Sequence, residues 1–405
     1  MKTVQGSSAI RIVAWVAALA GCASEPTAVP PPPPAAVVTV ATVPVPANYG
    51  IHDTYVRDGI AFVCVWNTGV QIYDVGNGMR GGSPSNPVLI TTFVPNSDDV
   101  PGGPQVHNAW WFHNPALHES RYLFLGQEGP GNIGFSSAGD LHVLDVSDLA
   151  NPREVSVYSM AGAGVHNFWM DEPAARLYAA YYNGGVVAFD VSGTLPADLS
   201  SRVIATAMPG GPSATYVWGV QLADGALWAV DMLSGFWKLD PVTLGTLGGG
   251  NNVPDRYGSD LWVAADYGYT GTWGGVGRTG VRGDAIKVWR VSGVGDPALV
   301  DSVIFTAINT VSDLQVSDDG AFLAATAEGQ TNGGLYLLSL ANPAKPVVVS
   351  TTLVDRGLHT GTIATIGGRQ FVFGAKNPPN PALMIFDVTG VVPSSATGPR
   401  SSAAR

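Results

Sequence analysis

One phrase recurs seven times along this chain: an apolar run that ends in a turn, most often Asp-Val followed by Ser, Thr or Gly. The residues that close the apolar run are Asp74, Asp145, Asp190, Asp240, Arg290, Ser339 and Asp387. After a first gap of 71 residues, the markers follow at intervals of 45, 50, 50, 49 and 48. A period near 50 with several strand-like runs per unit is typical of a β-propeller.

Within each unit the apolar runs keep a constant order. An inner run comes first, then a second run such as 61–66 or 177–181, then the marker run, then an outer run that Pro introduces. We therefore predict an all-β fold over 36–392: a seven-bladed β-propeller of four-stranded antiparallel blades. The last unit lacks an outer run, so we expect the unassigned run 37–43 to complete it and close the ring.

Composition agrees with this fold class and excludes others. The 51 Gly and 30 Pro with only 13% charged residues disfavour long helices, and 46% hydrophobic residues argue against a disordered chain. The formal net charge of −11, without basic blocks, makes the chain a poor nucleic-acid binder, so we expect no nucleic-acid partner. We expect the polar tail 393–405 to be disordered.

The N-terminus predicts an address outside the cytoplasm. Lys2 and Arg11 precede the apolar stretch 12–20, which is too short for a permanent membrane helix and is typical of a signal peptide. Leu19-Ala20-Gly21-Cys22 resembles a bacterial lipobox, in which cleavage precedes a lipid-modified Cys. This predicts a signal peptide (1–21), a lipidated Cys22 on a Pro-rich tether (22–35), and anchoring to a bacterial membrane. Because no Asp follows Cys22, the outer membrane is favoured in a Gram-negative source; the alternative is an ordinary signal peptide with an incidental Cys.

Lipidation of Cys22 would leave Cys64 as the only thiol, because the chain has 2 Cys. No intramolecular disulfide is then possible, so packing must stabilise the fold. Cys64 lies in the apolar run 61–66, where we expect a small buried hydrophobic side chain rather than a reactive thiol.

The Asp-Val-Ser turns and the outer runs led by Asn-Pro resemble those of the LVIVD-repeat propellers of secreted bacterial proteins. The likeness covers roughly 36–392 and is clearest at 139–155, 184–193, 333–347 and 382–390. It is weakest at 251–300, where Arg290 replaces the marker Asp. The resemblance implies a propeller and a secreted protein, but no single activity.

Four of the inner runs begin with His and a polar residue. These pairs are His52-Asp53, His107-Asn108, His166-Asn167 and His359-Thr360, in what would be four contiguous blades. Inner strands start at the face where second strands end, so we expect His52 opposite Asn67, His107 opposite Glu128, His166 opposite Asn183 and His359 opposite Asn377. In the other blades we expect Trp218 with Asp231, Asp266, and Asp313 with Glu328. Together these side chains predict a polar funnel at the top face.

Two interpretations of the funnel remain open. Converging imidazoles and carboxylates can bind a transition metal or a polar ligand. Alternatively, the repeated polar residues tie adjacent blades together through hydrogen bonds to backbone groups. We place His113 and His118 at the opposite rim and expect His142, in the middle of its strand, to be either partnered or half exposed.

No catalytic motif decides the function. Two G-x-G-x-x-G strings, at 129–134 and 275–280, are each followed by a strand rather than a helix, so neither is a nucleotide site. We favour a membrane-anchored binding or scaffold propeller without catalysis, with a protein, polar small molecule or glycan at a rim shaped by the insertions 76–104 and 127–139. The alternative is a metal-dependent hydrolase or oxidoreductase that uses the four funnel histidines, with Glu128 as acid or base. A third hypothesis is a carbohydrate binder that uses Trp66, Trp218 and Tyr267.

Overall fold

The computed structural model describes residues 36–46, 50–95, 103–133, 136–250, 256–274, 280–293 and 295–392. The predicted signal peptide, Cys22, the tether and the tail 393–405 lie outside these residues. Within the described ranges, no helix is long and apolar enough to span a membrane.

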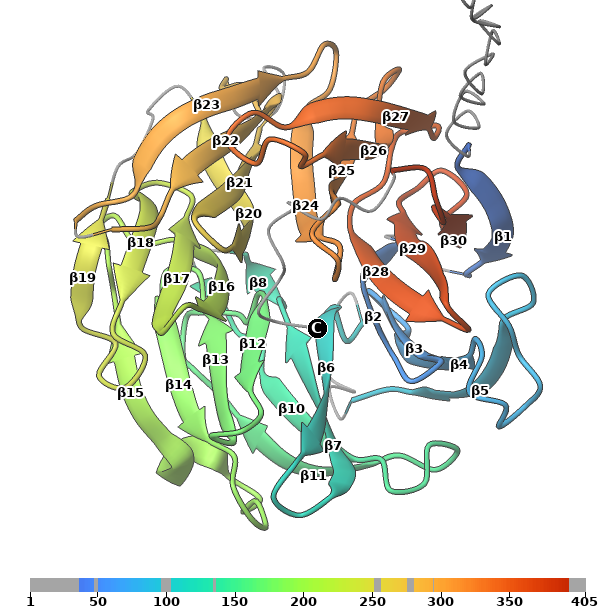
Figure 1. Cartoon of the computed structure of the whole chain (residues 1–405). Coiled ribbons are helices and arrows are strands. Elements are labelled where there is room, and N and C mark those ends of the chain that lie inside the picture. Colours follow the sequence, from blue (N-terminus) through green and yellow to red (C-terminus); the bar gives the residue numbers. More distant parts are fainter. Residues whose placement is uncertain are drawn as a thin grey trace, which may run out of the picture. The chain divides into compact units, whose positions relative to one another are not determined.

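Seven four-stranded antiparallel sheets form the blades of a β-propeller, as predicted (Figure 1). Blade 1 contains β2 (Ile51–Arg57), β3 (Ile60–Val65), β4 (Gly69–Asp74) and β5 (Val88–Phe93), and blade 2 contains β6 (Val106–Asn114), β7 (Glu119–Gln127), β10 (Leu141–Asp145) and β11 (Arg153–Tyr158). Blade 3 contains β12 (Phe168–Asp171), β13 (Arg176–Ala180), β14 (Val186–Asp190) and β15 (Val203–Ala207), and blade 4 contains β16 (Val217–Ala223), β17 (Ala226–Asp231), β18 (Gly235–Leu239) and β19 (Thr246–Gly249).

The remaining blades follow the same order. Blade 5 contains β20 (Tyr257–Ala264), β21 (Tyr267–Trp273), β22 (Ala285–Arg290) and β23 (Ala298–Ile304), and blade 6 contains β24 (Thr310–Val316), β25 (Phe322–Glu328), β26 (Gly334–Ser339) and β27 (Val347–Leu353). Blade 7 contains β28 (Gly361–Ile366), β29 (Arg369–Lys376), β30 (Ala382–Asp387) and, as its outer strand, β1 (Val38–Pro44). A two-stranded hairpin, β8 (Gly131–Asn132) with β9 (Ser136–Ser137), and a short 3₁₀ helix, η1 (Leu199–Arg202), lie in connections.

The ring closes through the N-terminal strand. β1 runs antiparallel to β30, with Val38 opposite Asp387 and Pro44 opposite Ala382. The inner strands contact one another in sequence from β2 to β28, and β28 contacts β2 (Figure 1). Closure therefore joins the two ends of the domain within one blade, which confirms the predicted pairing and covers the free edge of β30.

Large side chains fill the interfaces between blades. Trp110 packs on Trp169 with ring centroids 5.4 Å apart, and Trp169 packs on Trp262 at 5.9 Å, so one aromatic row crosses from blade 2 to blade 5. Cys64 is fully buried and is a free thiol, as predicted. Burial of such large apolar faces stabilises a fold in which the described residues form no disulfide.

The marker aspartates cap the turns after the third strands. The carboxylate of Asp145 accepts from the Ser147 N–H at 3.0 Å, and that of Asp190 accepts from the Ser192 N–H at 2.9 Å. This is the Asx-turn geometry that Asp favours, so the marker is a structural signal, as expected. Asp74 forms the most extensive of these caps. The loop 76–82 wraps around its carboxylate, which accepts hydrogen bonds from five backbone N–H groups.

Candidate functional site

A β-bulge starts each inner strand, where two residues oppose one residue of the second strand. The register slips at this point in blades 1, 2, 4, 5 and 6. In blade 3 the His166 N–H donates to the Ala180 carbonyl while the Ala180 N–H donates to the Asn167 carbonyl, and blade 7 repeats this at 359, 360 and 375. The seven bulge pairs are His52-Asp53, His107-Asn108, His166-Asn167, Trp218-Gly219, Ser259-Asp260, Ser312-Asp313 and His359-Thr360. A bulge re-aims side chains, and here it does so at equivalent places around the axis.

The first residues of four neighbouring pairs bring their imidazole rings together. The ring centroids of His359 and His52 lie 4.1 Å apart, those of His52 and His107 4.4 Å, and those of His107 and His166 3.9 Å. The arc continues to Trp218, whose ring lies 4.3 Å from that of His166. Four predicted funnel histidines thus form one contiguous cluster.

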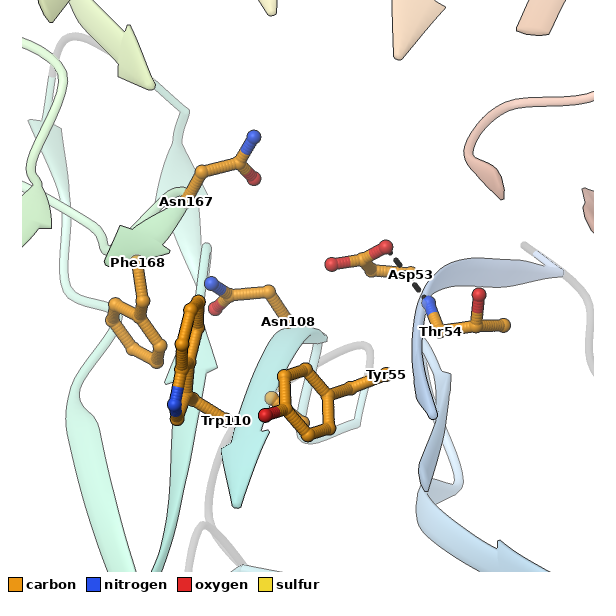
Figure 2. A pocket seen from close by; sticks show the side chains of 8 residues that line it. Asp53, Thr54, Tyr55, Asn108, Trp110, Asn167 and Phe168 are labelled. Carbon is orange, nitrogen blue, oxygen red and sulfur yellow. Dashed lines mark hydrogen bonds between the residues drawn. The ribbon is translucent and has the colours of Figure 1, made fainter. Parts of the chain in front are cut away.

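The second residues form a lower layer on the axis, where they connect blades. Figure 2 shows Asp53, Asn108 and Asn167 reaching into a common space, which holds about 10 Å³, room for a single water. The Asn167 amide donates to Asp260 Oδ1 at 2.9 Å, and Asp260 Oδ2 accepts from the Leu314 N–H at 3.1 Å. This layer is therefore structural, as the blade-tying interpretation predicted.

Above the histidines the channel opens into a cavity of about 930 Å³ with two unlike walls. One wall comes mainly from blades 3, 4 and 5 and is largely aromatic or apolar: Ile133, Tyr182, Tyr216, Trp218, Met232, Leu233, Tyr257 and Trp273. The other is mostly polar and comes mainly from blades 6, 7, 1 and 2: His52, Trp66, Gln105, Glu128, Glu328, His359 and Asn377. Ile133, on the β7–β10 insertion, packs against the buried cluster of the aromatic wall.

A hydrogen-bonded relay runs along the polar wall. Glu328 Oε1 lies 2.5 Å from His359 Nδ1, and His359 Nε2 lies 3.0 Å from His52 Nδ1. His52 Nε2 in turn lies 3.4 Å from Glu128 Oε2, and the Tyr182 hydroxyl donates to Glu128 Oε1. The relay joins blades 6, 7, 1, 2 and 3 at the level of the cavity floor.

The environments shift the pKa values of these histidines in opposite directions. Burial holds the pKa of His107 and of His166 well below the ordinary value, and neighbouring imidazoles add to this effect. Burial also opposes the charge on His359, but the hydrogen bond and charge of Glu328 outweigh it and raise the pKa of His359. The floor is therefore neutral at His107 and His166, whereas Glu328 stabilises the protonated form of His359 by compensating its charge.

The structure places the predicted site residues in three groups. His52, Glu128, Trp218, Glu328 and His359 line the large cavity. Two further histidines, His107 and His166, lie in its floor around a small void that Asp53, Asn167 and Trp218 also line, and Asn108 belongs to the lower layer. The side chain stacked on His52 is Trp66, at 4.5 Å between centroids, and Glu128 pairs with His52.

Two predicted funnel residues are elsewhere. Asp266 is exposed in the turn between β20 and β21, at the opposite end of the strands from Trp273. The equivalent bulge pair in that blade is Ser259-Asp260, which carries no His to mark it. Asp231 is fully buried, and its carboxylate accepts backbone N–H groups of Tyr216, Leu233 and Ser234, so it caps a turn.

The predictions about cavity aromatics and rim insertions are confirmed only in part. Tyr267 begins β21 beside Asp266 and is not a cavity aromatic; Trp273, at the far end of the same strand, is. The insertion 127–139 does reach the cavity through Gly131 and Ile133. Of the insertion 76–104, the part at 76–82 instead folds around Asp74 at the opposite end of β4.

The remaining histidines lie where the sequence indicated. His142 Nδ1 lies 2.8 Å from Glu154 Oε2, and His142 Nε2 lies 3.3 Å from Gln127 Oε1. His113 and His118 line a shallow surface hollow with Arg57 and Glu172 at the far rim.

Sequence reasoning missed most of the aromatic wall: Tyr182, Tyr216, Tyr257 and Trp273. Tyr182 and Trp273 lie at or just after the end of a second strand. Tyr216 lies just before an inner strand, and Tyr257 is the first residue of one. The same rule that located Glu128 and Glu328 would have found them, because all lie at the face where second strands end.

Comparisons with known proteins identify the architecture alone. No family model matches the chain, and no curated protein matches it. Among solved structures, the C-terminal WD40 domain of Sif2 matches with a TM-score of 0.54 and 10% identity over 86% of this chain and 98% of that one. The computationally designed Ika8 protein matches with a TM-score of 0.53 and 11% identity over 89% of this chain and 91% of that one. At such identities the likeness shows a shared β-propeller fold, and the resemblance to LVIVD-repeat propellers remains a prediction.

Proposed function

We propose that this protein is a binding module that captures a small organic molecule in its central cavity. The observation that carries the proposal is the pair of unlike walls around a space of about 930 Å³. That volume lies at the upper end of the range of about 300–1,000 Å³ for small-molecule sites, which are mostly apolar with a few placed polar groups. A scaffold role alone would not require such a space.

The lining indicates the chemistry of the ligand. Trp218 and Trp273 lie 6.3 Å apart between centroids, and Tyr257 lies 6.4 Å from Trp273, so a flat apolar group can pack among their rings. Opposite them, Glu128 and Glu328 offer carboxylate oxygens to a hydrogen-bond donor. Among the described residues that line the cavity, none is Lys or Arg. The site therefore favours a neutral or cationic ligand over an anion.

Capture would take place outside the cytoplasm, on a lipid anchor at Cys22. The supporting observations are the lipobox-like Leu19-Ala20-Gly21-Cys22 and the Pro-rich segment that follows it. The resemblance to the LVIVD-repeat propellers of secreted bacterial proteins supports the same address. Mass spectrometry of the N-terminal peptide should detect an acylated Cys22, and Cys22→Ser should release the protein from membranes. Detection of an unmodified Cys22 in membrane-bound protein would contradict the anchor.

A second candidate function, a metal-dependent enzyme, is favoured by one observation. Ligand atoms of His52, His107 and Glu128 all lie within 4.8 Å of one another. We assign no reaction to this cluster, because nothing in the cavity specifies a substrate bond.

Calorimetric titration can test ligand capture with three compounds that share one ring system. We expect the full chain carrying Cys22→Ser to bind tryptamine more tightly than indole, and indole more tightly than indole-3-acetate. Trp273→Ala should weaken binding about tenfold, because stacking on a large ring contributes roughly 1 kcal/mol or more. Trp237→Ala is the matched control, since Trp237 lies on β18 outside the cavity lining. Preference for the anion, or no binding of any of the three at millimolar concentration, would overturn the proposal.

A further inference from the structure

The polar floor of the cavity brings together two imidazoles and a carboxylate from two blades. His52 comes from blade 1, and His107 and Glu128 come from blade 2. His107 and Glu128 are buried, at 1% and 5% exposure, and His52 is partly buried at the cavity edge. Neutral imidazole nitrogens with one carboxylate oxygen are a donor set that binds Zn²⁺ and Cu²⁺.

The spacing of two of these groups suits a bound ion. His52 Nε2 and Glu128 Oε2 lie 3.4 Å apart. Two ligands of a tetrahedral ion, each about 2.0–2.1 Å from the metal, lie about 3.4 Å from one another. His107 belongs to the same cluster, in which all the ligand atoms lie within 4.8 Å of each other, so a small side-chain adjustment completes three-fold coordination.

The hydrogen-bonded relay behind His52 determines whether its Nε2 faces Glu128 with a lone pair or with an N–H. In the metal-bound state Glu328 accepts from the Nδ1–H of a neutral His359, and the Nε2 of His359 accepts from the Nδ1–H of His52. The Nε2 lone pair of His52 then faces the Glu128 carboxylate, an arrangement that a cation between them stabilises. Histidine metal ligands commonly have their other nitrogen held by such a partner, and that partner is often a carboxylate or linked to one.

The state of His107 favours a bound metal ion over the simpler alternative, an extra proton held between His52 and His359. The Nδ1 of His107 is buried without a hydrogen-bond partner among the described residues. The Nε2 of the neighbouring His166 is likewise buried and has no such partner there. A proton shared between His52 and His359 leaves the imidazole of His107 unused. A metal ion bound by His107 engages that ring directly.

We propose that His52, His107 and Glu128 bind one divalent transition-metal ion, of the Zn²⁺ or Cu²⁺ class, at the floor of the cavity. His359 and Glu328 orient His52, and the remaining coordination position faces the cavity. Three protein ligands with one open position are typical of sites that present the metal to a small molecule. The proposal goes beyond capture of an organic ligand and is tested without one.

The test uses the full chain with Cys22→Ser, stripped with a chelator, dialysed, and titrated with Zn²⁺ or Cu²⁺ against a chromophoric chelator. We expect one equivalent of metal per chain by mass spectrometry. Glu128→Gln and His52→Gln should each weaken affinity at least about tenfold, and His359→Gln about 10- to 100-fold through the lost orientation of His52. With Cu²⁺, electron paramagnetic resonance should show coupling to two nitrogens in the parent and to one in His52→Gln.

The matched controls are Glu154→Gln and His142→Gln. These residues form a carboxylate–imidazole pair at 2.8 Å between a buried His142 and a partly buried Glu154, in blade 2 but outside the cavity lining. They should keep parental affinity, and circular dichroism should show every variant folded. Substoichiometric uptake by the parent, or uptake that survives both Glu128→Gln and His52→Gln, overturns the site. Metal binding that fails while indole-series binding persists would leave the proposed function standing.

Discussion

Asp74 offers the sharpest test of how the marker turns stabilise the propeller. Its carboxylate accepts from the N–H groups of Gly76, Asn77, Gly78, Arg80 and Gly82 at 2.6–3.2 Å. Burial alone would raise the pKa of this carboxyl, but the backbone donors lower it from 3.8 to about 2. At about 1.36 kcal/mol per pH unit, this difference corresponds to about 2 kcal/mol of folding free energy.

The sign of the pH dependence follows from a folded-state pKa that lies below the unfolded one. The contribution of Asp74 is fully present above pH 3.8 and is lost as the pH falls through about 2. Asp74→Asn should therefore lower the free energy of unfolding by about 2 kcal/mol at pH 7 and by much less at pH 2. The amide, like the protonated carboxyl, keeps one acceptor oxygen and carries no charge, so the same figure applies to the substitution.

Urea denaturation of parent and variant at both pH values measures the difference. Comparing the two proteins at each pH removes the general loss of stability in acid that other paired carboxylates cause. Asp224→Asn is the matched control, because Asp224 is exposed in a hairpin turn at φ 49°, a conformation that Asn tolerates. An Asp74→Asn effect that is as large at pH 2 as at pH 7 would refute the carboxylate argument and point to loop packing instead.

Three further outcomes are expected. An ion pair with a 2.5 Å contact joins Arg57 of blade 1 to Glu172 of blade 3. In a double-mutant cycle, Arg57→Ala and Glu172→Ala should show a coupling of about 1 kcal/mol in the free energy of unfolding, and additive losses would contradict the pairing. Deletion of 36–44 should expose the edge of β30 and promote aggregation, measured by light scattering, and a monomeric deletion variant of unchanged stability would argue against the closure. Buried Cys64, whose pKa burial raises well above the ordinary thiol value, should resist maleimide labelling until urea unfolds the chain; rapid labelling of native protein would show that the blade interface opens.

The fold was predictable because its repeats carry redundant signals. An Asp that caps a turn, as Asp145 and Asp190 do, recurs at nearly constant spacing, so its replacement at Arg290 and Ser339 did not hide those two blades. The closing strand β1 could be inferred because one unit lacked an outer run. Both inferences rest on the number of strands per blade, which hydrophobic runs encode directly.

The site was only partly predictable, because bulges and local side-chain choices decide it. His52 and His359 were found through a repeated His that happens to occupy the bulge. In blade 5 the same position holds Ser259-Asp260, whose residue types give no such signal, and the expectation fell wrongly on Asp266 in the turn at the other end of the strand. The relay between His359 and His52 joins residues 307 positions apart, a contact that only the closed ring creates.

The bulge positions also discriminate between the structural and the ligand-binding interpretation of the histidines. Ser259 Oγ donates to the Val311 carbonyl of the next blade at 2.6 Å, and Ser312 Oγ donates to Leu358 in the same way at 3.4 Å. His166 Nδ1 makes the equivalent contact with the Trp218 carbonyl at 2.5 Å, so a serine or a histidine can tie blades here.

The imidazoles of His52 and His359 do something else at the equivalent place. They bond to one another and, at either end of the pair, approach Glu128 and Glu328 at the edge of the large cavity. If blade tying were the only requirement, a serine at these positions would satisfy it at lower cost than buried, charge-bearing groups. Imidazole and carboxylate groups are therefore concentrated on one side of the ring, opposite an aromatic wall. This distribution favours recognition of a ligand in the cavity over a role limited to assembly of the blades.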